Sequence, residues 1–172
     1  MTTPTTKSDG FYPAGGPAPA FSLTAVKSGR QISLGTCKGN VLGMVFHGRE
    51  TVQAVVEINT TVRPLYPDPS PVILVSVIDL SIVPRLLHGA VKPILEQAYD
   101  QAAREIPKGY DPADYVFLLP DWNGAVTKAF KAKDTGKMAA VVVIDPQGQV
   151  VGSYQGPQPG PATLSLIQQA LA

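Results

Sequence analysis

Continuous apolar runs alternate with helically spaced apolar residues along the 172-residue chain. Short apolar runs bounded by turn-forming residues predict strands that are covered on both faces of a sheet, at 41–46, 72–78 and 115–119. The segments between and after these runs predict helices, over 51–65, 93–105 and from about 161. Strands that alternate with helices in this way predict an α/β fold.

Prolines mark where the predicted helices begin and end. Pro64 and the proline-rich stretch 66–71 end the first helix and form a stiff turn. Pro84 and Pro93 limit the residues between them to a short helical piece, and Pro93 suits the first position of the helix that follows. We therefore expect the second helix to begin at residue 93.

Turn-forming residues predict a hairpin at each end of the chain. Residues 26–34 form a short hairpin turned at Ser28-Gly29. Near the C-terminus, 139–144 pairs with 149–154 across the Asp-Pro-Gln-Gly turn between them. A short helix is expected around 125–130.

The N-terminal residues differ from the rest of the chain. Residues 1–16 are rich in Thr, Pro and Gly, so we expect them to form a flexible tail. The remainder, 17–172, has no internal repeat and predicts one domain. A chain of this length buries about two-thirds of its unfolded surface, so it needs neither a disulfide nor a metal for stability.

Composition excludes several classes of function. A formal net charge of +1, without a run of basic residues, argues against nucleic acid and against an anionic membrane surface. A single cysteine excludes an intramolecular disulfide and multi-cysteine metal motifs, so no metal or other cofactor is expected. The N-terminus lacks the apolar segment of a signal peptide, and no stretch is long enough to cross a bilayer. The expected compartment is cytoplasmic.

The densest polar group follows the first buried strand, where the chain enters a helix. It comprises His47, Arg49, Glu50 and Thr51. Strand ends that lead into a helix N-terminus are frequent ligand sites in α/β proteins. These residues are therefore candidates for binding a ligand or partner, and His47 with Thr51 is a candidate base–hydroxyl pair. The alternative interpretation is a solvated rim without a function.

Other candidate residues lie near predicted strand ends or in loops. Trp122 is predicted to pack at the end of the sheet, with an interface role as the alternative. Asp79 and Asp121 follow two central strands and are expected to be solvated strand ends rather than an acid pair. His47 and His88 lack the partners of a metal site, and haem ligation by either is a minor alternative.

Several segments, in order, resemble one known superfamily. The opening resembles its Gly-x-x-Ala-Pro-x-Phe-x-Leu pattern, and later pieces resemble its Lys-Gly signature and its Leu-Ile-Asp-x-x-Gly-x-Val hairpin. The matching segments are 16–23, 29–34, 38–41, 118–126 and 143–150. Together they resemble the peroxiredoxin and thiol–disulfide reductase (redoxin) superfamily. The resemblance implies a thioredoxin-like three-layer fold: a central mixed β-sheet flanked by helices, with an N-terminal hairpin.

The chain departs from this superfamily at its active site. Thr51 and Ala54 occupy the positions of the Cys-x-x-Cys motif, and the segment 137–139 lacks the proline that faces the disulfide in the family. Thiol–disulfide exchange requires an attacking thiolate, which neither threonine nor alanine supplies. The resemblance therefore predicts a redox-inactive domain, with enzymatic activity not expected at this junction.

The leading hypothesis is a binding protein that uses the 47–54 junction and the adjacent 120–124 loop. The partner is an unidentified protein or small molecule, and the oligomeric state is left open. A second hypothesis is a one-cysteine thiol peroxidase that uses Cys37, whose pKa the adjacent Lys38 could lower. The alternative interpretation of Cys37 is a half-buried small residue without a reactive role. A third hypothesis is an assembly subunit that uses an edge strand or the segment 84–109, which is longer than the family usually carries.

Overall fold

The computed structural model describes residues 10–172, which form a five-stranded sheet and a separate two-stranded sheet. The larger sheet comprises β3 (Val41–His47), β4 (Val72–Asp79), β5 (Leu118–Asp121), β6 (Ala140–Ile144) and β7 (Val150–Gln155). Their order is β5–β4–β3–β6–β7, in which β3, β4 and β5 are parallel and β6 and β7 make antiparallel pairs. The smaller sheet is the antiparallel hairpin of β1 (Ser22–Thr24) and β2 (Gln31–Ser33).

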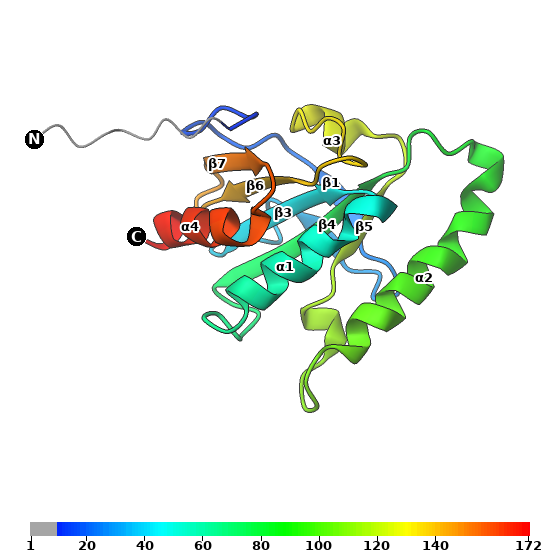
Figure 1. Ribbon diagram of the computed structural model, residues 1–172, viewed down its shortest axis with the longest axis horizontal. Coiled ribbons are helices and arrows are strands. Elements are labelled where there is room, and N and C mark those ends of the chain that lie inside the picture. Colours follow the sequence, from blue (N-terminus) through cyan, green and yellow to red (C-terminus); the bar gives the residue numbers. More distant parts are fainter. Residues whose placement is uncertain (1–9) are drawn as a thin grey trace, which may run out of the picture.

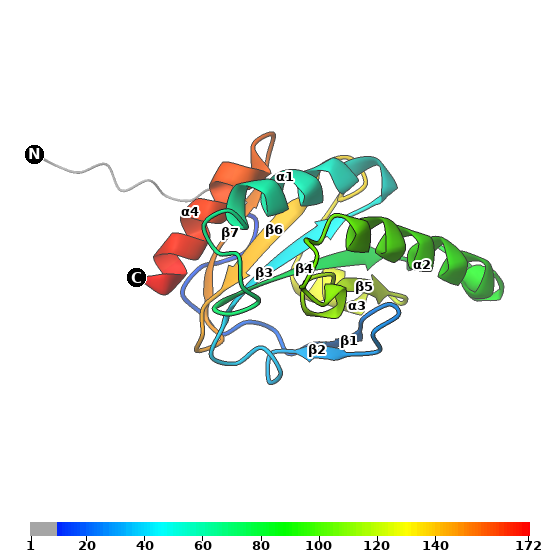
Figure 2. The same ribbon diagram turned by 90° about the horizontal axis from the view of Figure 1, so that it is seen from below.

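Helices and the hairpin cover opposite faces of the larger sheet, which gives three layers (Figures 1 and 2). One outer layer holds α1 (Val52–Val62), α2 (His88–Arg104) and α4 (Pro159–Leu171). The other holds the hairpin and the short α3 (Ala125–Ala129). Single 3₁₀ turns lie at η1 (Arg49–Thr51), η2 (Arg85–Leu87) and η3 (Pro112–Asp114). The predicted thioredoxin-like three-layer arrangement is confirmed.

The complete burial of the central strand β3 explains why the apolar run at 41–46 predicts a strand. All of its side chains are buried, and alternate residues enter two different cores. Leu42, Met44 and Phe46 join the core beneath the hairpin and α3. Val41 and Val45 join the core beneath α1 and α4. A strand covered on both faces requires apolar residues at every position, which produces a continuous run.

Two prolines lie inside elements that they were expected to bound. Pro120 lies within β5, an edge strand of the sheet, where a residue without a backbone N–H is tolerated because one side of the strand has no neighbouring strand. Pro93 lies inside α2, which begins at His88 rather than at residue 93. Pro93 and Gly89 are both exposed, so the Gly89 carbonyl that lacks a helical donor can bond to water. The predicted start of this helix is therefore wrong by five residues.

Residues 10–16, expected to belong to a flexible tail, are part of the folded domain. Gly15 N–H donates to Val150 O, and Val150 N–H donates to Gly16 O, each at 2.8 Å. The Tyr12 ring packs on Phe130 with ring centroids 5.9 Å apart. This segment forms backbone hydrogen bonds with β7, which is otherwise an edge strand of the sheet. Its Gly- and Pro-rich composition gives no sign of this pairing. The rest of the predicted tail, 1–9, lies outside the described residues.

The N-terminal hairpin is confirmed, although its strands lie further from the turn than predicted. Its first strand begins at Ser22 rather than at residue 26, and Ser22 pairs with Ser33. Gly29 adopts a left-handed conformation (φ 67°) in the turn and donates to Ala25 O at 3.1 Å. The C-terminal hairpin and the terminal helix agree with the predictions to within two residues.

Candidate functional site

His47, the first residue of the predicted site, is a buried structural residue. It ends β3 with only 4% of its surface exposed. Its Nδ1 lies 3.0 Å from Gly48 O, and its Nε2 is hydrogen bonded to Ser76 Oγ on the neighbouring β4. Because a carbonyl oxygen only accepts, Nδ1 carries the proton and Nε2 accepts from the hydroxyl of Ser76. Burial lowers the pKa of His47, and its hydrogen bond to the Gly48 backbone offsets part of this effect.

Thr51 closes the junction rather than opening it to a ligand. Its Oγ1 accepts from Gly48 N–H at 2.9 Å and donates to Thr135 O at 2.7 Å. The loop that carries Thr135 also packs on Gly48, where an added Cβ would lie 3.2 Å from the Cα of Gly136. Since the hydroxyl proton of Thr51 and both nitrogens of His47 have other partners, the two side chains do not form the candidate base–hydroxyl pair.

Arg49 and Glu50 are the exposed members of the predicted site. Both lie on the η1 turn, and neither forms an ion pair within residues 10–172. Val52 and Gln53, at the start of α1, are also exposed. The junction therefore presents exposed side chains above a buried, hydrogen-bonded interior.

Cys37 lies at the opposite end of the sheet from this junction. It precedes β3, whereas His47 ends it, and a seven-residue strand spans about 20 Å. Only 4% of Cys37 is exposed, so the expectation of a half-buried residue underestimates its burial. Burial raises the pKa of the Cys37 thiol, while hydrogen bonds to Thr36 and to the Ser33 backbone oppose this rise. A raised pKa leaves the thiol protonated near neutral pH, which is the unreactive form.

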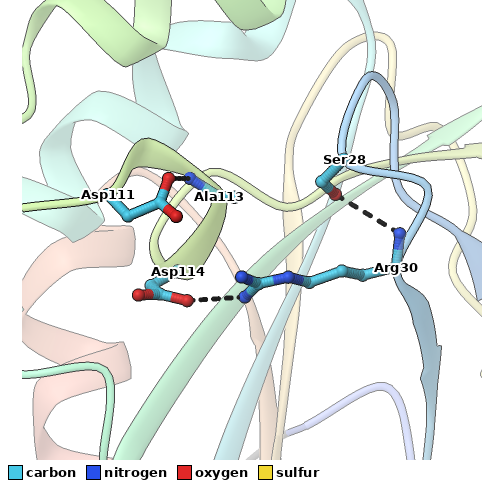
Figure 3. Close-up of polar contacts among 5 residues, drawn as sticks. All are labelled: Ser28, Arg30, Asp111, Ala113 and Asp114. Atoms are coloured by element: carbon cyan, nitrogen blue, oxygen red, sulfur yellow. Dashed lines mark hydrogen bonds and ion pairs between the residues drawn. The ribbon is translucent and has the colours of Figure 1, made fainter.

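A small cavity of about 390 Å³ lies beside Cys37. Its rim includes an ion pair between Arg30 of the hairpin and Asp114 of η3, with Nη1 and Oδ1 2.6 Å apart (Figure 3). Figure 3 also shows Ser28 Oγ accepting from Arg30 N–H, and Asp111 capping the η3 turn by accepting from Ala113 N–H. The Arg30–Asp114 ion pair joins the hairpin to the loop before β5, and both residues line the cavity with Cys37.

A larger groove, of about 1120 Å³, lies at the carboxyl ends of β4 and β5. Arg85, His88 and Lys92 line it from η2 and α2, and Trp122 and Asn123 line it from the loop after β5. Of these residues, Trp122 was predicted from the sequence as a site candidate, whereas Arg85 and Lys92 were not. Arg85, His88 and Lys92 follow the spacing i, i+3 and i+7, which places them on one face of a helix. This pattern is visible only once the helical segment is known to begin before residue 93.

Trp122 packs at the end of the sheet and also lines the groove. It packs on a small cluster formed by Leu80, Leu95 and Leu118, which ties α2 to the sheet. Its ring also stacks on His88, with centroids 4.4 Å apart and planes at 36°, and this pair forms a wall of the groove. His88 Nε2 lies 3.2 Å from Val83 O, which fixes the orientation of the imidazole.

The expectation that Asp121 is a solvated strand end is wrong. Only 1% of Asp121 is exposed, and its Oδ2 accepts from both N–H and Oγ1–H of Thr127, at 2.7 and 2.8 Å. Its Oδ1 is buried without a donor among the described residues. Asp79, its neighbour on β4, is less buried and accepts from Ser81 N–H at 2.9 Å. Each carboxylate holds the turn that follows its own strand.

The loop between Asp121 and α3 is held rigidly. Asn123 Oδ1 accepts from Ala125 N–H at 3.0 Å. Gly124 adopts a left-handed conformation (φ 70°), and a Cβ there would lie 2.9 Å from the Cβ of Ser81. The hydrogen bond and the close approach of Gly124 to Ser81 restrict the shape of this loop.

Residues 10–172 carry neither a cluster of metal-ligating side chains nor a helix that could cross a membrane. No three side chains of His, Cys, Asp or Glu lie close enough together there to hold a metal ion. None of the described helices combines the length and the apolar composition that crossing a membrane requires.

Sequence comparisons give no relative: no protein-family model and no curated protein matches the chain. Solved structures do match. A thiol:disulfide interchange protein of the thioredoxin family from Chlorobium tepidum is 18% identical with a TM-score of 0.62, and the match covers 91% of this chain and 97% of that one. The exposed lipoprotein thioredoxin Etrx1 from Streptococcus pneumoniae is 16% identical with a TM-score of 0.61, covering 88% and 99%.

A third structure agrees with these two. The thioredoxin domain of a thiol-disulfide oxidoreductase from Bacteroides vulgatus is 14% identical with a TM-score of 0.59, and the match covers 90% of this chain and 98% of that one. At these identities the likeness concerns the fold alone. The chain contains one cysteine, far from the β3–α1 junction. The protein therefore has the thioredoxin-like fold of the thiol:disulfide oxidoreductases without a pair of active-site cysteines.

Proposed function

We propose that this protein is a thioredoxin-like domain that acts by recognition rather than by thiol–disulfide exchange. The observation that carries the proposal is the β3–α1 junction, where the hydroxyl of Thr51 is bound to Gly48 N–H and to Thr135 O. Ala54, one helical turn later, has no group able to resolve a mixed disulfide. The recognition surface in this proposal is the sheet edge at which β3, β4 and β5 end.

The buried state of Cys37 supports the same proposal. A peroxidatic cysteine must be a thiolate that peroxide can reach, and Cys37 is enclosed, with a pKa raised by burial. It also lies a strand length away from Thr51. We therefore do not favour the one-cysteine peroxidase that the sequence left open as an alternative.

Turnover assays test this proposal. Purified wild type and Cys37→Ser are assayed for insulin disulfide reduction with dithiothreitol and for peroxide consumption. We expect neither protein to exceed the uncatalysed rate. A Thr51→Cys/Ala54→Cys variant in the Cys37→Ser background restores the dithiol spacing and is expected to gain insulin reduction. Wild-type turnover that Cys37→Ser abolishes would refute the proposal.

A further inference from the structure

We propose that the groove at the carboxyl ends of β4 and β5 binds an acidic, extended peptide segment of a partner protein. This inference rests on the recognition role proposed above and adds the chemistry of the partner. It concerns the groove lined by Arg85, His88, Lys92, Trp122 and Asn123, here called the β5 groove.

The charge of the β5 groove is the first argument. Arg85 and Lys92 are exposed on the same face of η2 and α2, and neither has a carboxylate within 4.0 Å among the described residues. The first turn of α2 contains no acidic residue, so its N-terminal dipole adds to the positive potential there. An acidic ligand would pair with Arg85 and Lys92, which have no acidic partner among the described residues.

The acidic groups near the groove do not neutralise these two cations. Asp121 lines the groove but is only 1% exposed; its Oδ2 accepts from Thr127, and its Oδ1 has no donor among the described residues. Asp79 accepts from Ser81 N–H through Oδ1. Glu96, one turn after Lys92 on α2, is exposed and forms no ion pair with it. Neither Arg85 nor Lys92 is therefore paired with any of these carboxylates.

The shape of the groove is the second argument. Its volume of about 1120 Å³ exceeds the range of roughly 300–1,000 Å³ usual for small-molecule sites, and its wall along one side is β1. The stacked Trp122 and His88 offer an aromatic surface, and Val126 of α3 adds an aliphatic one. Alternating apolar and acidic side chains of an extended segment would meet these apolar walls and the two cations in turn.

The rim supplies a third argument. Ile82 and Leu86, which flank the groove residues Val83 and Arg85 in sequence, are 90% and 96% exposed. Exposed aliphatic side chains of this size, adjacent in sequence to groove residues that include an unpaired cation, favour a surface that a partner covers. The rigid 121–125 loop favours binding because little ordering is needed on association.

Peptide selection tests the proposal directly. A random dodecapeptide library is panned against the wild type and against Arg85→Gln/Lys92→Gln. We expect wild-type selections enriched in Asp and Glu between apolar residues. Affinity is then measured from the fluorescence of Trp122, the only tryptophan of the chain, as each synthetic peptide is added.

Matched controls make the result specific. Arg104→Gln/Lys108→Gln removes two exposed positive charges near the other end of α2, about 18 Å or more from Lys92 at 1.5 Å per residue. Arg85→Gln/Lys92→Gln is expected to weaken binding at least tenfold, and the control variant less than twofold. Replacing the peptide's Glu residues by Gln, or raising the salt concentration, should also weaken binding.

Three results would overturn the inference. These are selections without acidic enrichment, selected peptides that bind Arg85→Gln/Lys92→Gln as tightly as wild type, and saturation of the Trp122 signal by inorganic phosphate or free glutamate at micromolar concentration. The last would assign the groove to a small anion. None of these results alters the insulin and peroxide assays, so failure here is distinct from failure of the proposed function.

Discussion

The β3–α1 junction and the β5 groove lie at the same edge of one sheet, yet they are built in opposite ways. At the junction, His47 and Thr51 direct their polar atoms inward to Ser76, Gly48 and Thr135. At the groove, Arg85 and Lys92 extend outward without acidic partners among the described residues. Polar residues near a strand end are thus of two kinds, and only those with unused bonding capacity are candidates for recognition.

The two regions differ in what covers the strand ends. Thioredoxin-like enzymes need an accessible pair of cysteines where β3 meets α1, and here that position is sealed by the 135–136 loop. At the neighbouring ends of β4 and β5 a groove remains, lined on one side by α2, which the small cluster around Trp122 holds against the sheet, and on another by β1. The following predictions test this contrast, from the largest expected effect to the smallest.

His47→Ala should destabilise the fold more than any other single change at the predicted site. It removes a buried ring and leaves Ser76 Oγ and Gly48 O without their partner. We expect a loss of about 2–4 kcal/mol in the free energy of unfolding, measured by urea denaturation. His88→Ala, at the groove wall, is the comparison and should cost less. A negligible loss for His47→Ala would contradict its structural role.

Acid should destabilise the protein through His47. Its folded pKa lies below the unfolded value of about 6.5, so the unfolded state binds more protons as the pH falls. The contribution of His47 is therefore complete above the unfolded pKa. Below it, stability is lost at up to about 1.4 kcal/mol per pH unit until the folded pKa is reached. Urea titrations between pH 7.5 and 5 should show a shallower dependence for His47→Gln than for wild type.

Thr51→Val should loosen the junction without opening a cavity, because valine has a similar shape. It removes the acceptor for Gly48 N–H and the donor to Thr135 O. We expect a loss of about 1–2 kcal/mol, together with faster amide hydrogen exchange at Gly48. Thr60→Val, whose hydroxyl bonds only within α1, serves as the control. Unchanged exchange at Gly48 would show that the seal does not depend on this hydroxyl.

Arg49→Gln/Glu50→Gln should have the smallest effect. Both side chains are exposed and form no ion pair among the described residues, so the change in stability should stay within about 0.5 kcal/mol. Affinity for peptides selected on the β5 groove should also stay within twofold. A larger loss of affinity than that caused by Arg85→Gln/Lys92→Gln would move the recognition surface back to the junction.

Much of the fold could be predicted from the sequence because its signals are local. The buried strands appear as continuous apolar runs, and the final hairpin is set by the Asp-Pro-Gln-Gly turn between its strands. The errors arose where tertiary contacts override a local rule. Pro120 lies in an edge strand, and Pro93 lies in an exposed turn of α2, where a missing N–H is tolerated. Residues 10–16 form hydrogen bonds with the open edge of β7.

The candidate site was less accessible to sequence reasoning. Polar residues after a strand were identified, but a sequence does not say whether a side chain turns toward the core or toward solvent. His47 and Asp121 turn inward, because Ser76 and Thr127 on other segments supply their hydrogen bonds. Arg85 and Lys92 were not predicted as site residues, because it is not apparent that they share one face until the start of α2 is known.

The sequence by itself determined the α/β class, the thioredoxin-like arrangement and the lack of a cysteine pair, since each depends on residue type and order along the chain. The tertiary structure alone decided that the junction is sealed, that Cys37 is enclosed, and that a groove lies at the end of β5. The reason is physical: periodicity and turn chemistry act between near neighbours, whereas burial, hydrogen-bond partners and hollows depend on segments that are distant in sequence and meet only in the folded chain.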